Sequence, residues 1–377
     1  MNKKRFMGIL VIVMALGMTV SGCDDGGNTG QPEIFTCTVN DESYELTITN
    51  GSSFKLQIGS DISTGAASKD GNIWTLTPIY GGPFTVTVSG NSITKIEGTI
   101  TFDDETEKEI PGEVAGPENF HIYLCFGQSN MEGVNNTTNH LIPPEYKTWT
   151  NDRFQVLASV NMSQFNPARQ KENWYTAAPP LVRGDRGLCP ADNFGRTLVE
   201  KISNPKIKIG VIIVAVSGAA LDIFDKVNYE SYINGLDAGT ISWMSGSYNL
   251  YNSNPYARLV ELAKIAQEDG VIKGILLHQG ESAGGTPTWG ANVKRIYDDL
   301  LSDLGLAPTS IPLLAGEPIR WNKNLINGLP AISPQFYAIS SSGCEALTGG
   351  DADHFSPAGM MELGKRYGEK MFDLLYK

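Results

Sequence analysis

Three polar residues that lie far apart in the sequence have the types that acyl transfer to a serine requires. Ser129 stands in FGQSNMEG, where the apolar run HIYLCF stops abruptly at a glycine and polar residues. His354 follows Asp351 by three residues in DADHF. On one tight turn this spacing can bring a carboxylate to one imidazole nitrogen and leave the other for a serine hydroxyl. We therefore predict Ser129 as nucleophile, His354 as general base and Asp351 as the acid that orients it.

Among the four histidines, only His354 has an aspartate three residues before it. His121 lies inside an apolar strand pattern and is predicted to be structural. His140 stands in a loop without other recognisable features. His278 ends an apolar run, where its ring can pack or bond a neighbouring loop. Asp353 is interpreted as a solvated loop acid.

Acyl transfer also needs N–H donors aimed at the oxygen that becomes negative. Gly218, in SGAA after the run KIGVIIVAV, offers a backbone N–H with no side chain in the way. Gln279, in LHQGES after IKGILL, offers a side-chain amide. Ser129 adds its own backbone N–H if a helix begins there. We predict an oxyanion hole made by Gly218, Gln279 and Ser129.

The elements that position these residues follow a strand–helix rhythm from Phe120 onward. Apolar strands are predicted at HIYLCF, KIGVIIVAV, IKGILLH, IPLLAG and QFYAIS. Helical patterns lie at ADNFGRTLVEKI, YARLVELAKIAQEDG and GANVKRIYDDLLSDLG, and a last helix has Ser356 as its N-cap. This order predicts an α/β domain with a parallel sheet between two helical layers. Because parallel strands end at one edge, the loops carrying the site segments are expected to meet there.

The region before Phe120 has a different rhythm. Runs such as SYELTIT, SFKLQIG and PFTVTVSG alternate apolar and polar residues, and Asn-Gly, Asp-Gly and Gly-Gly pairs separate them. We predict a small antiparallel all-β domain, a sandwich or barrel, with a role as a spacer in preference to a glycan-binding module.

The first residues resemble the leader of a bacterial lipoprotein. Three basic residues precede an apolar run that is short for a membrane span, and the run ends in VSGC at Cys23. A lipid on Cys23 would make the protein membrane-anchored, periplasmic or at the cell surface, with the lipid as its only membrane contact. The predicted organisation is a signal peptide at 1–22, a tether at 23–33, the β domain at 34–104, a linker at 105–117 and the catalytic domain at 118–377.

The charge and the cysteines exclude several classes of function. A net charge of −12 argues against nucleic acid or anionic lipid as a partner and fits a neutral substrate such as a polysaccharide. The cysteines show no CxxC pair, so a zinc ribbon is not expected, and the sequence does not choose a disulfide pair. Asp351, Asp353 and Glu281 lack the spacing of a calcium loop. The sequence G-Q-S-N-M is not the G-x-S-x-G of α/β-hydrolases. We expect no metal and no cofactor.

FGQSNMEG, Gly218 at a strand end, LHQGES and DADHF, in that order, resemble the SGNH-type hydrolases. They are most similar to the branch with the carbohydrate esterase family 6 acetylxylan esterases and the sialate O-acetylesterases, over residues 118–377. The resemblance implies a flavodoxin-like three-layer fold and the roles given above. Within this branch the orienting acid is either the Asp of DxxH or the Glu of HQGE. Asp351 and Glu281 therefore compete for that role, and the local spacing favours Asp351.

These observations predict an esterase that removes acetyl groups from a carbohydrate of the acetylxylan type through a covalent acyl-enzyme. A sialate O-acetylesterase is the first alternative. A non-catalytic, glycan-binding lipoprotein on an esterase scaffold is the second. Four tryptophans in or beside loops are expected either to stack on sugar rings or to pack in the core: Trp174, Trp243, Trp289 and Trp321.

Overall fold

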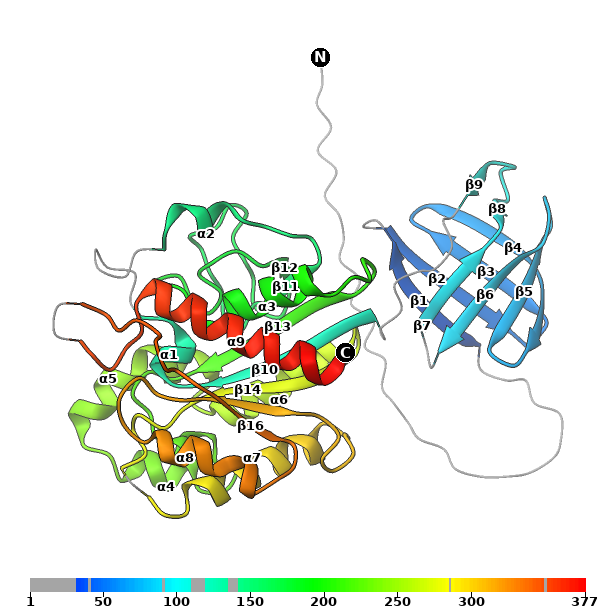
Figure 1. Cartoon of the computed structure of the whole chain (residues 1–377). Helices are drawn as coiled ribbons and strands as arrows, with labels where there is room; N and C mark the ends of the chain where they lie inside the picture. The colour runs from blue at the N-terminus through cyan, green and yellow to red at the C-terminus, as the bar shows by residue number, and fades with distance from the viewer. Residues whose placement is uncertain are drawn as a thin grey trace, which may run out of the picture.

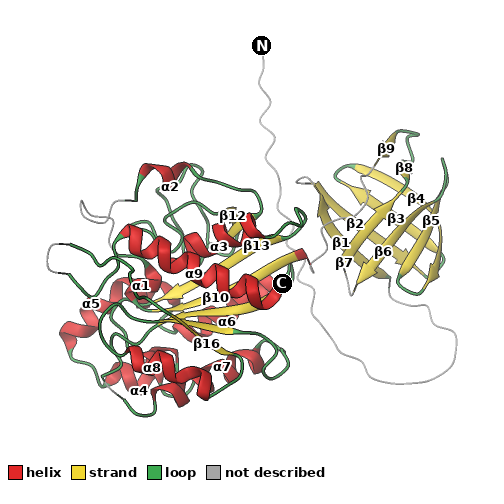
Figure 2. Ribbon diagram, viewed as in Figure 1, coloured by secondary structure: helices red, strands yellow, loops and turns green. Residues whose placement is uncertain are grey.

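The computed structural model describes residues 32–39, 42–89, 92–109, 119–134, 142–284, 286–348 and 351–377. The predicted signal peptide, Cys23 and His140 lie outside this part of the chain. Within it, no helix has both the length and the apolar character needed to cross a membrane. The described residues form an all-β domain and an α/β domain (Figures 1 and 2).

The amino-terminal domain is an antiparallel barrel, as the alternating pattern predicts. Its strands pair in chain order, and a single parallel pair between Thr36 and Ser92 closes the barrel. In β3, Phe54, Leu56 and Ile58 point inward while the residues between them face outward or lie part-buried. The barrel strands are β1 (Glu33–Val39), β2 (Glu42–Thr49), β3 (Ser53–Ile58), β4 (Asp61–Asp70), β5 (Ile73–Pro78), β6 (Phe84–Ser89) and β7 (Ser92–Glu97).

Two features of this domain were not expected from the pattern. Strand β4, DISTGAASKD, carries almost no large apolar residue. It approaches β5 closely at Gly65, where a Cβ would lie 2.1 Å from the Thr77 carbonyl oxygen. A hairpin of β8 (Thr99–Thr101) and β9 (Glu107–Glu109) follows the barrel. The antiparallel region therefore continues past Asp104, into the segment predicted as a linker.

The second domain is built on a sheet of seven strands in the order β12-β11-β13-β10-β14-β15-β16. All pairings are parallel except that of the edge strand β12 with β11. This is the α/β architecture that the sequence predicts. The strands are β10 (Phe120–Gly127), β11 (Phe154–Leu157), β12 (Trp174–Thr176), β13 (Lys208–Ala215), β14 (Val271–His278), β15 (Leu313–Gly316) and β16 (Phe336–Ile339).

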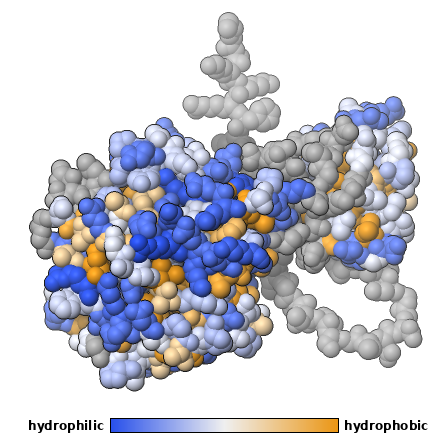
Figure 3. All heavy atoms as spheres, in the orientation of Figure 1, coloured by the Kyte–Doolittle hydropathy of each residue, from blue (hydrophilic) through white to orange (hydrophobic). Residues whose placement is uncertain are grey.

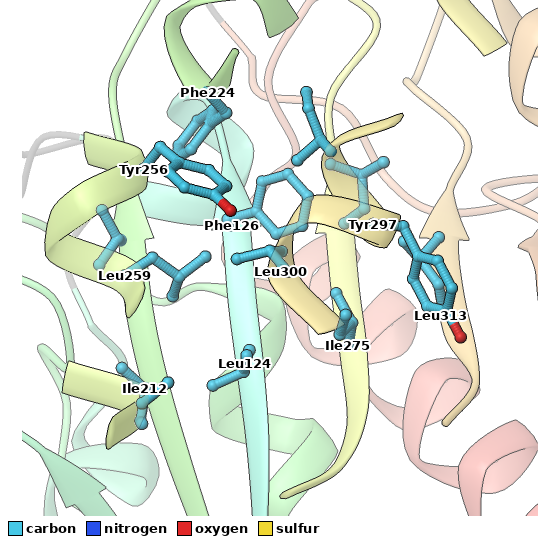
Figure 4. Close-up of a cluster of buried hydrophobic side chains, with 14 of the residues drawn as sticks. Leu124, Phe126, Ile212, Phe224, Tyr256, Leu259, Ile275, Tyr297, Leu300 and Leu313 are labelled. Carbon is cyan, nitrogen blue, oxygen red and sulfur yellow. The ribbon is translucent and has the colours of Figure 1, made fainter. Parts of the chain in front are cut away.

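Helices cover both faces of the sheet, which explains why its central strands are apolar throughout. From β10, Leu124 and Phe126 point to one face, where they pack with side chains of α6 and α7 (Figure 4). Tyr123 and Cys125 point to the other face, against α3 and α9. The long helices are α3 (Pro190–Lys201), α6 (Pro255–Gln267), α7 (Trp289–Asp303) and α9 (Pro357–Leu375).

Helices α3 and α9 pack with their backbones close together. A Cβ at Gly364 would lie 2.3 Å from the Pro190 carbonyl oxygen, and one at Gly368 would lie 2.7 Å from Cβ of Thr197. These two glycines bring α9 onto α3, which fixes the start of α9 just after His354. Hydrophilic side chains cover much of the face on which α9 lies (Figure 3).

Shorter helices lie in the connections at the carboxyl ends of the strands. Ser129 begins the short helix α1, and α5 follows the segment SGAA after β13. Their bounds are α1 (Ser129–Glu132), α2 (Pro144–Thr148), α4 (Tyr229–Asn234), α5 (Ala238–Tyr248) and α8 (Lys323–Gly328).

Candidate active site

A glycine lets the chain turn from β10 into the helix that begins with Ser129. Gly127 has φ +153°, and a Cβ there would lie 2.0 Å from the carbonyl oxygen of His278. The N–H of Gln128 donates to the same carbonyl at 3.1 Å. The break in the apolar run at Gly127 therefore marks where β10 ends beside His278, the last residue of its parallel neighbour β14, and delivers Ser129 to the carboxyl edge of the sheet (Figure 1).

Ser129, His354 and Asp351 form one hydrogen-bonded row. Nδ1 of His354 lies 2.7 Å from Oδ2 and 2.9 Å from Oδ1 of Asp351. A carboxylate only accepts, so Nδ1 carries the proton and Nε2 is the acceptor. Nε2 lies 2.7 Å from Oγ of Ser129, which donates to it. The arrangement matches that of a nucleophile, a base and an orienting acid.

The surroundings keep the Asp351 carboxyl ionised. Partial burial acts to raise its pKa, but the hydrogen bond and charge of His354 and the backbone N–H groups of Asp353 and His354 outweigh burial. The net result is a pKa below the usual value for aspartate. The negative charge thus stays beside the imidazole, where it stabilises the imidazolium that proton transfer from Ser129 creates.

Glu281, the competing acid, makes a different set of contacts. Its Oε1 accepts from Nδ2 of Asn130 at 2.7 Å and lies 3.2 Å from Nε2 of His278, without the alignment of a hydrogen bond. Burial acts to raise the pKa of Glu281, but His278 and the hydrogen bond from Asn130 lower it overall. The ring of His354 is oriented by Asp351, so the geometry does not give Glu281 the orienting role.

Asn130, which the sequence did not single out, joins the nucleophile to the loop of the base. Besides its bond to Glu281, its Nδ2 donates to the carbonyl of Asp353 at 3.1 Å, and its Oδ1 accepts from the N–H of Phe355 at 3.2 Å. These two bonds lie on either side of His354 in the chain. Asn130 and Glu281 therefore hold the 353–355 segment against the start of α1.

Gly218 stands at the end of β13 in a conformation that only glycine adopts easily. Its φ is +69°, and a Cβ there would lie 1.7 Å from Cζ3 of Trp243. Ser282 fixes the loop from the other side, because its hydroxyl donates to the Gly218 carbonyl at 3.2 Å. The predicted oxyanion donor is thus a held backbone position beside an aromatic ring.

The Gln279 side chain braces the loop that carries Gly218. Its Nε2 donates to the carbonyl of Ala219 at 2.9 Å, and its Oε1 accepts from the N–H of Gly280 at 2.9 Å. The side chain is buried, with 1% of its surface exposed. Its contacts therefore support the segment that carries Gly218, and the oxyanion role of Gln279 stays a prediction.

A buried carboxylate, which the sequence also did not single out, links helix α1 to the Gly218 loop and to α5. Glu132 accepts from Nε of Arg183 at 2.7 Å and from the hydroxyl of Ser217, and it lies 3.4 Å from Arg186. Burial raises the pKa of Glu132 above its usual value, although Arg183 and several hydrogen bonds oppose this. Arg183 in turn donates to the carbonyl of Gly246 at 3.1 Å, in α5. One carboxylate thus ties α1, the Gly218 loop and α5 together.

The four tryptophans divide into two pairs. Trp289 is buried, and Trp174 is half-buried against Phe120 at the opposite end of β10 from Ser129. Trp243 and Trp321 are 64% and 59% exposed. Across the described residues, no group of three or more His, Cys, Asp and Glu side chains is arranged to hold a metal ion.

Residues 119–373 match the family model described as carbohydrate esterase, sialic acid-specific acetylesterase. A solved protein from Arabidopsis thaliana is 19% identical and covers 68% of this chain and 99% of its own, with a TM-score of 0.50. NanS is 16% identical over 69% of this chain and 98% of its own, with a TM-score of 0.48. A carbohydrate acetylesterase from Xanthomonas citri is 13% identical over 89% of this chain and 71% of its own, with a TM-score of 0.46. The likeness to the Arabidopsis protein shows a shared fold.

Proposed function

The chain belongs to the carbohydrate esterase family described as sialic acid-specific acetylesterase and is a carboxylic ester hydrolase, and from this premise we propose that Ser129, His354 and Asp351 remove acetyl groups from a glycan of the acetylxylan type. The observation that carries the proposal is the 2.7 Å separation between Nε2 of His354 and Oγ of Ser129. Nδ1 of the same ring is held by Asp351, as a general base requires.

The proposed reaction has two half-reactions. In the first, Oγ of Ser129 attacks the acetyl carbon while Nε2 of His354 takes the hydroxyl proton. The bond from carbon to the sugar oxygen then breaks, and His354 returns the proton to that oxygen. In the second, His354 deprotonates a water molecule that attacks the acetyl-serine, and acetate leaves as Ser129 regains its proton.

The N–H groups of Ser129 and Gly218 are the proposed donors to the oxyanion. The N–H of Ser129 belongs to the first turn of α1 and so has no acceptor within the helix. Gly218 lies at the end of the neighbouring strand β13, held by Ser282. Two donors fixed in advance cost no reorganisation when the negative charge develops, and each is typically worth about 3–4 kcal/mol of barrier.

The negative charge around Ser129, His354 and Asp351 supports a neutral sugar as the substrate. The side chains of Asp351 and Asp353 are 40% and 55% exposed, beside His354. An anionic sugar would meet these carboxylates, and the cation next to them, Arg320, already lies 3.5 Å from Asp353. This supports the acetylxylan-type substrate. A sialate O-acetylesterase is the second candidate, because the matching family is described as sialic acid-specific.

The same proposal extends to where the enzyme works. Lys3, Lys4 and Arg5, the apolar run that follows and Cys23 support export and lipid attachment to a bacterial membrane. An acidic body carried on a lipid would face carbohydrate outside the cytoplasm.

The test is acetate release from p-nitrophenyl acetate, acetylated xylan and an O-acetylated sialic acid by residues 24–377. We expect Ser129→Ala and His354→Ala to lower kcat by about 10⁴-fold or more. Ser282→Ala serves as the matched control, since this serine bonds the Gly218 carbonyl instead of a described histidine. Its loss should lower kcat by at most about 100-fold. A fluorophosphonate should label the native protein and not Ser129→Ala.

Each outcome separates the candidates. Faster turnover of acetylated xylan supports the proposed substrate, and faster turnover of the sialic acid ester replaces it with the second candidate. If the native protein releases no acetate from any ester, or if Ser129→Ala is as active as native, the serine mechanism is wrong.

A further inference from the structure

Two exposed tryptophans lie on different segments of the site: Trp243 in α5, beside Gly218, and Trp321 between two residues that contact Gly280 and Asp353. We propose that Trp243 and Trp321 are stacking positions for two sugar rings of one glycan chain, so that the site selects an acetylated unit within an oligosaccharide over a free acetylated sugar. This inference rests on the proposed function and adds that the bound glycan has at least two sugar units and is uncharged.

Trp243 belongs to the oxyanion side of the site. The atoms that would meet a Cβ of Gly218 are Cζ3 and Cη2, which form the outer edge of the six-membered ring. The indole therefore touches Gly218 by its edge, and 64% of the residue remains exposed. A sugar whose acetyl oxygen accepts from Gly218 would have its own ring within reach of this indole.

The position of Trp243 is built into the fold, because its helix is tied to the catalytic loops. Arg183, paired with the buried Glu132, donates to the carbonyl of Gly246 at 3.1 Å and lies 3.4 Å from the hydroxyl of Ser247. Both residues belong to α5, as does Trp243. An exposed ring on a helix anchored in this way keeps its distance from Ser129 fixed.

Trp321 belongs to the side of the general base. Its neighbour Asn322 donates to the carbonyl of Gly280 at 2.7 Å, beside Glu281. Its other neighbour, Arg320, lies 3.5 Å from Asp353, one residue before His354. The guanidinium of Arg320 sits 5.0 Å from the centre of the Trp321 ring. It covers one face of the ring, and the residue is still 59% exposed.

The chemistry of the two rings fits a neutral pyranose. The face of an aromatic ring carries partial negative charge and attracts the weakly positive C–H groups that line one side of a sugar ring. Indole offers the largest such face among the side chains. The cation beside Trp321, Arg320, already faces the carboxylate of Asp353. One ring beside the Gly218 loop and a second next to the contacts with the Asp353 loop suit two units of one chain.

The test compares acetylated xylotetraose, acetylated xylose and ethyl acetate, an ester without a ring that could stack. For each variant the ratio of kcat/KM on the tetrasaccharide to that on ethyl acetate is measured. We expect Trp243→Leu and Trp321→Leu, which keep bulk without a flat face, to lower this ratio at least about 10-fold each. Trp243→Phe and Trp321→Phe should retain most of it. Trp174→Phe, at the opposite end of the sheet, should leave the ratio unchanged.

A binding measurement gives a second readout that needs no turnover. In Ser129→Ala, deacetylated xylotetraose should quench tryptophan fluorescence, and adding Trp243→Leu should weaken its apparent affinity at least about 10-fold. The inference fails if the native enzyme treats acetylated xylose and xylotetraose alike, or if both leucine variants keep the native ratio. An absence of acetate release from every ester would instead overturn the proposed function, and the titration would still report on the two rings.

Discussion

Around the nucleophile, two carboxylates have separate tasks. Asp351 contacts the ring of His354 directly, and hydrogen bonds from His354 and the backbone lower its pKa. Glu281 reaches the same loop only through Asn130, which bonds to Asp353 and Phe355. Asp351 fixes the tautomer of the His354 imidazole, and Glu281 helps to fix the position of the loop that carries it.

This division predicts unequal damage when each charge is removed. Asp351→Asn should lower kcat by about 10⁴-fold, because the amide favours the wrong imidazole tautomer. Glu281→Gln should lower it by at most about 100-fold, since a displaced base still has the correct tautomer. Steady-state kinetics on p-nitrophenyl acetate measures both. Equal losses in the two variants, or a larger loss in Glu281→Gln, would contradict the assignment.

The sequence identified the pair Asp351 and His354 because their contact is local, three residues apart on one turn. It did not predict that the Gln279 amide bonds to Ala219, on a loop 60 residues away. Glu132 and Arg183 went unnoticed for the same reason: an ion pair between distant segments leaves no pattern in either. Contacts across the sheet edge depend on strand order, which the sequence does not state.

At the scale of elements, α3 and α9 position the base by packing tightly on each other. The strongly periodic helices and the apolar strands were predictable, whereas β4 was not, because its residues are small and polar. Helix α3 begins with a buried capping arrangement in which Asp192 accepts from the N–H of Cys189 at 2.8 Å. Burial raises the pKa of Asp192 to about 6, despite this bond and the charge of Arg196.

The raised pKa of Asp192 predicts a pH effect with a defined sign. The folded chain binds this proton more tightly than the unfolded chain, so the free energy of unfolding falls as the pH rises from about 4 to about 6. Asp192→Asn should remove this decline, which amounts to about 3 kcal/mol. Urea denaturation at several pH values, followed by tryptophan fluorescence, gives the difference between native and variant.

The control is Asp373→Asn, an exposed aspartate on α9 whose pKa is lowered by its hydrogen bond with Lys377. Its contribution to stability is present at higher pH and is lost as the pH falls, which is the opposite sign. Identical pH slopes for the native protein and Asp192→Asn would show that the buried carboxyl is not proton-linked to folding.

For the whole molecule, the chain order is an expected lipid on Cys23, then the barrel, then the esterase domain. All the contacts described for the site come from residues after Phe120. The role of the barrel as a spacer between a membrane and the enzyme stays a prediction.

The anchor is tested by changing the lipidated residue in the full chain expressed in a bacterium. Native protein should sediment with membranes and incorporate labelled palmitate, while Cys23→Ala should do neither. Cys344→Ala, which changes a free cysteine of the esterase domain, is the control and should behave as native. If Cys23→Ala associates with membranes as strongly as the native chain does, the prediction that a lipid on Cys23 anchors the protein is wrong.

Arg183 holds α5 chiefly through the backbone carbonyl of Gly246, a group that every amino acid possesses. Substitutions along α5 therefore leave this attachment in place while they alter the surface that we propose a glycan contacts. Residues on the exposed side of α5 can therefore be substituted, in evolution or in a library, without changing the contacts of Ser129. The surface of α5 and the catalytic residues can in this sense change independently within one domain.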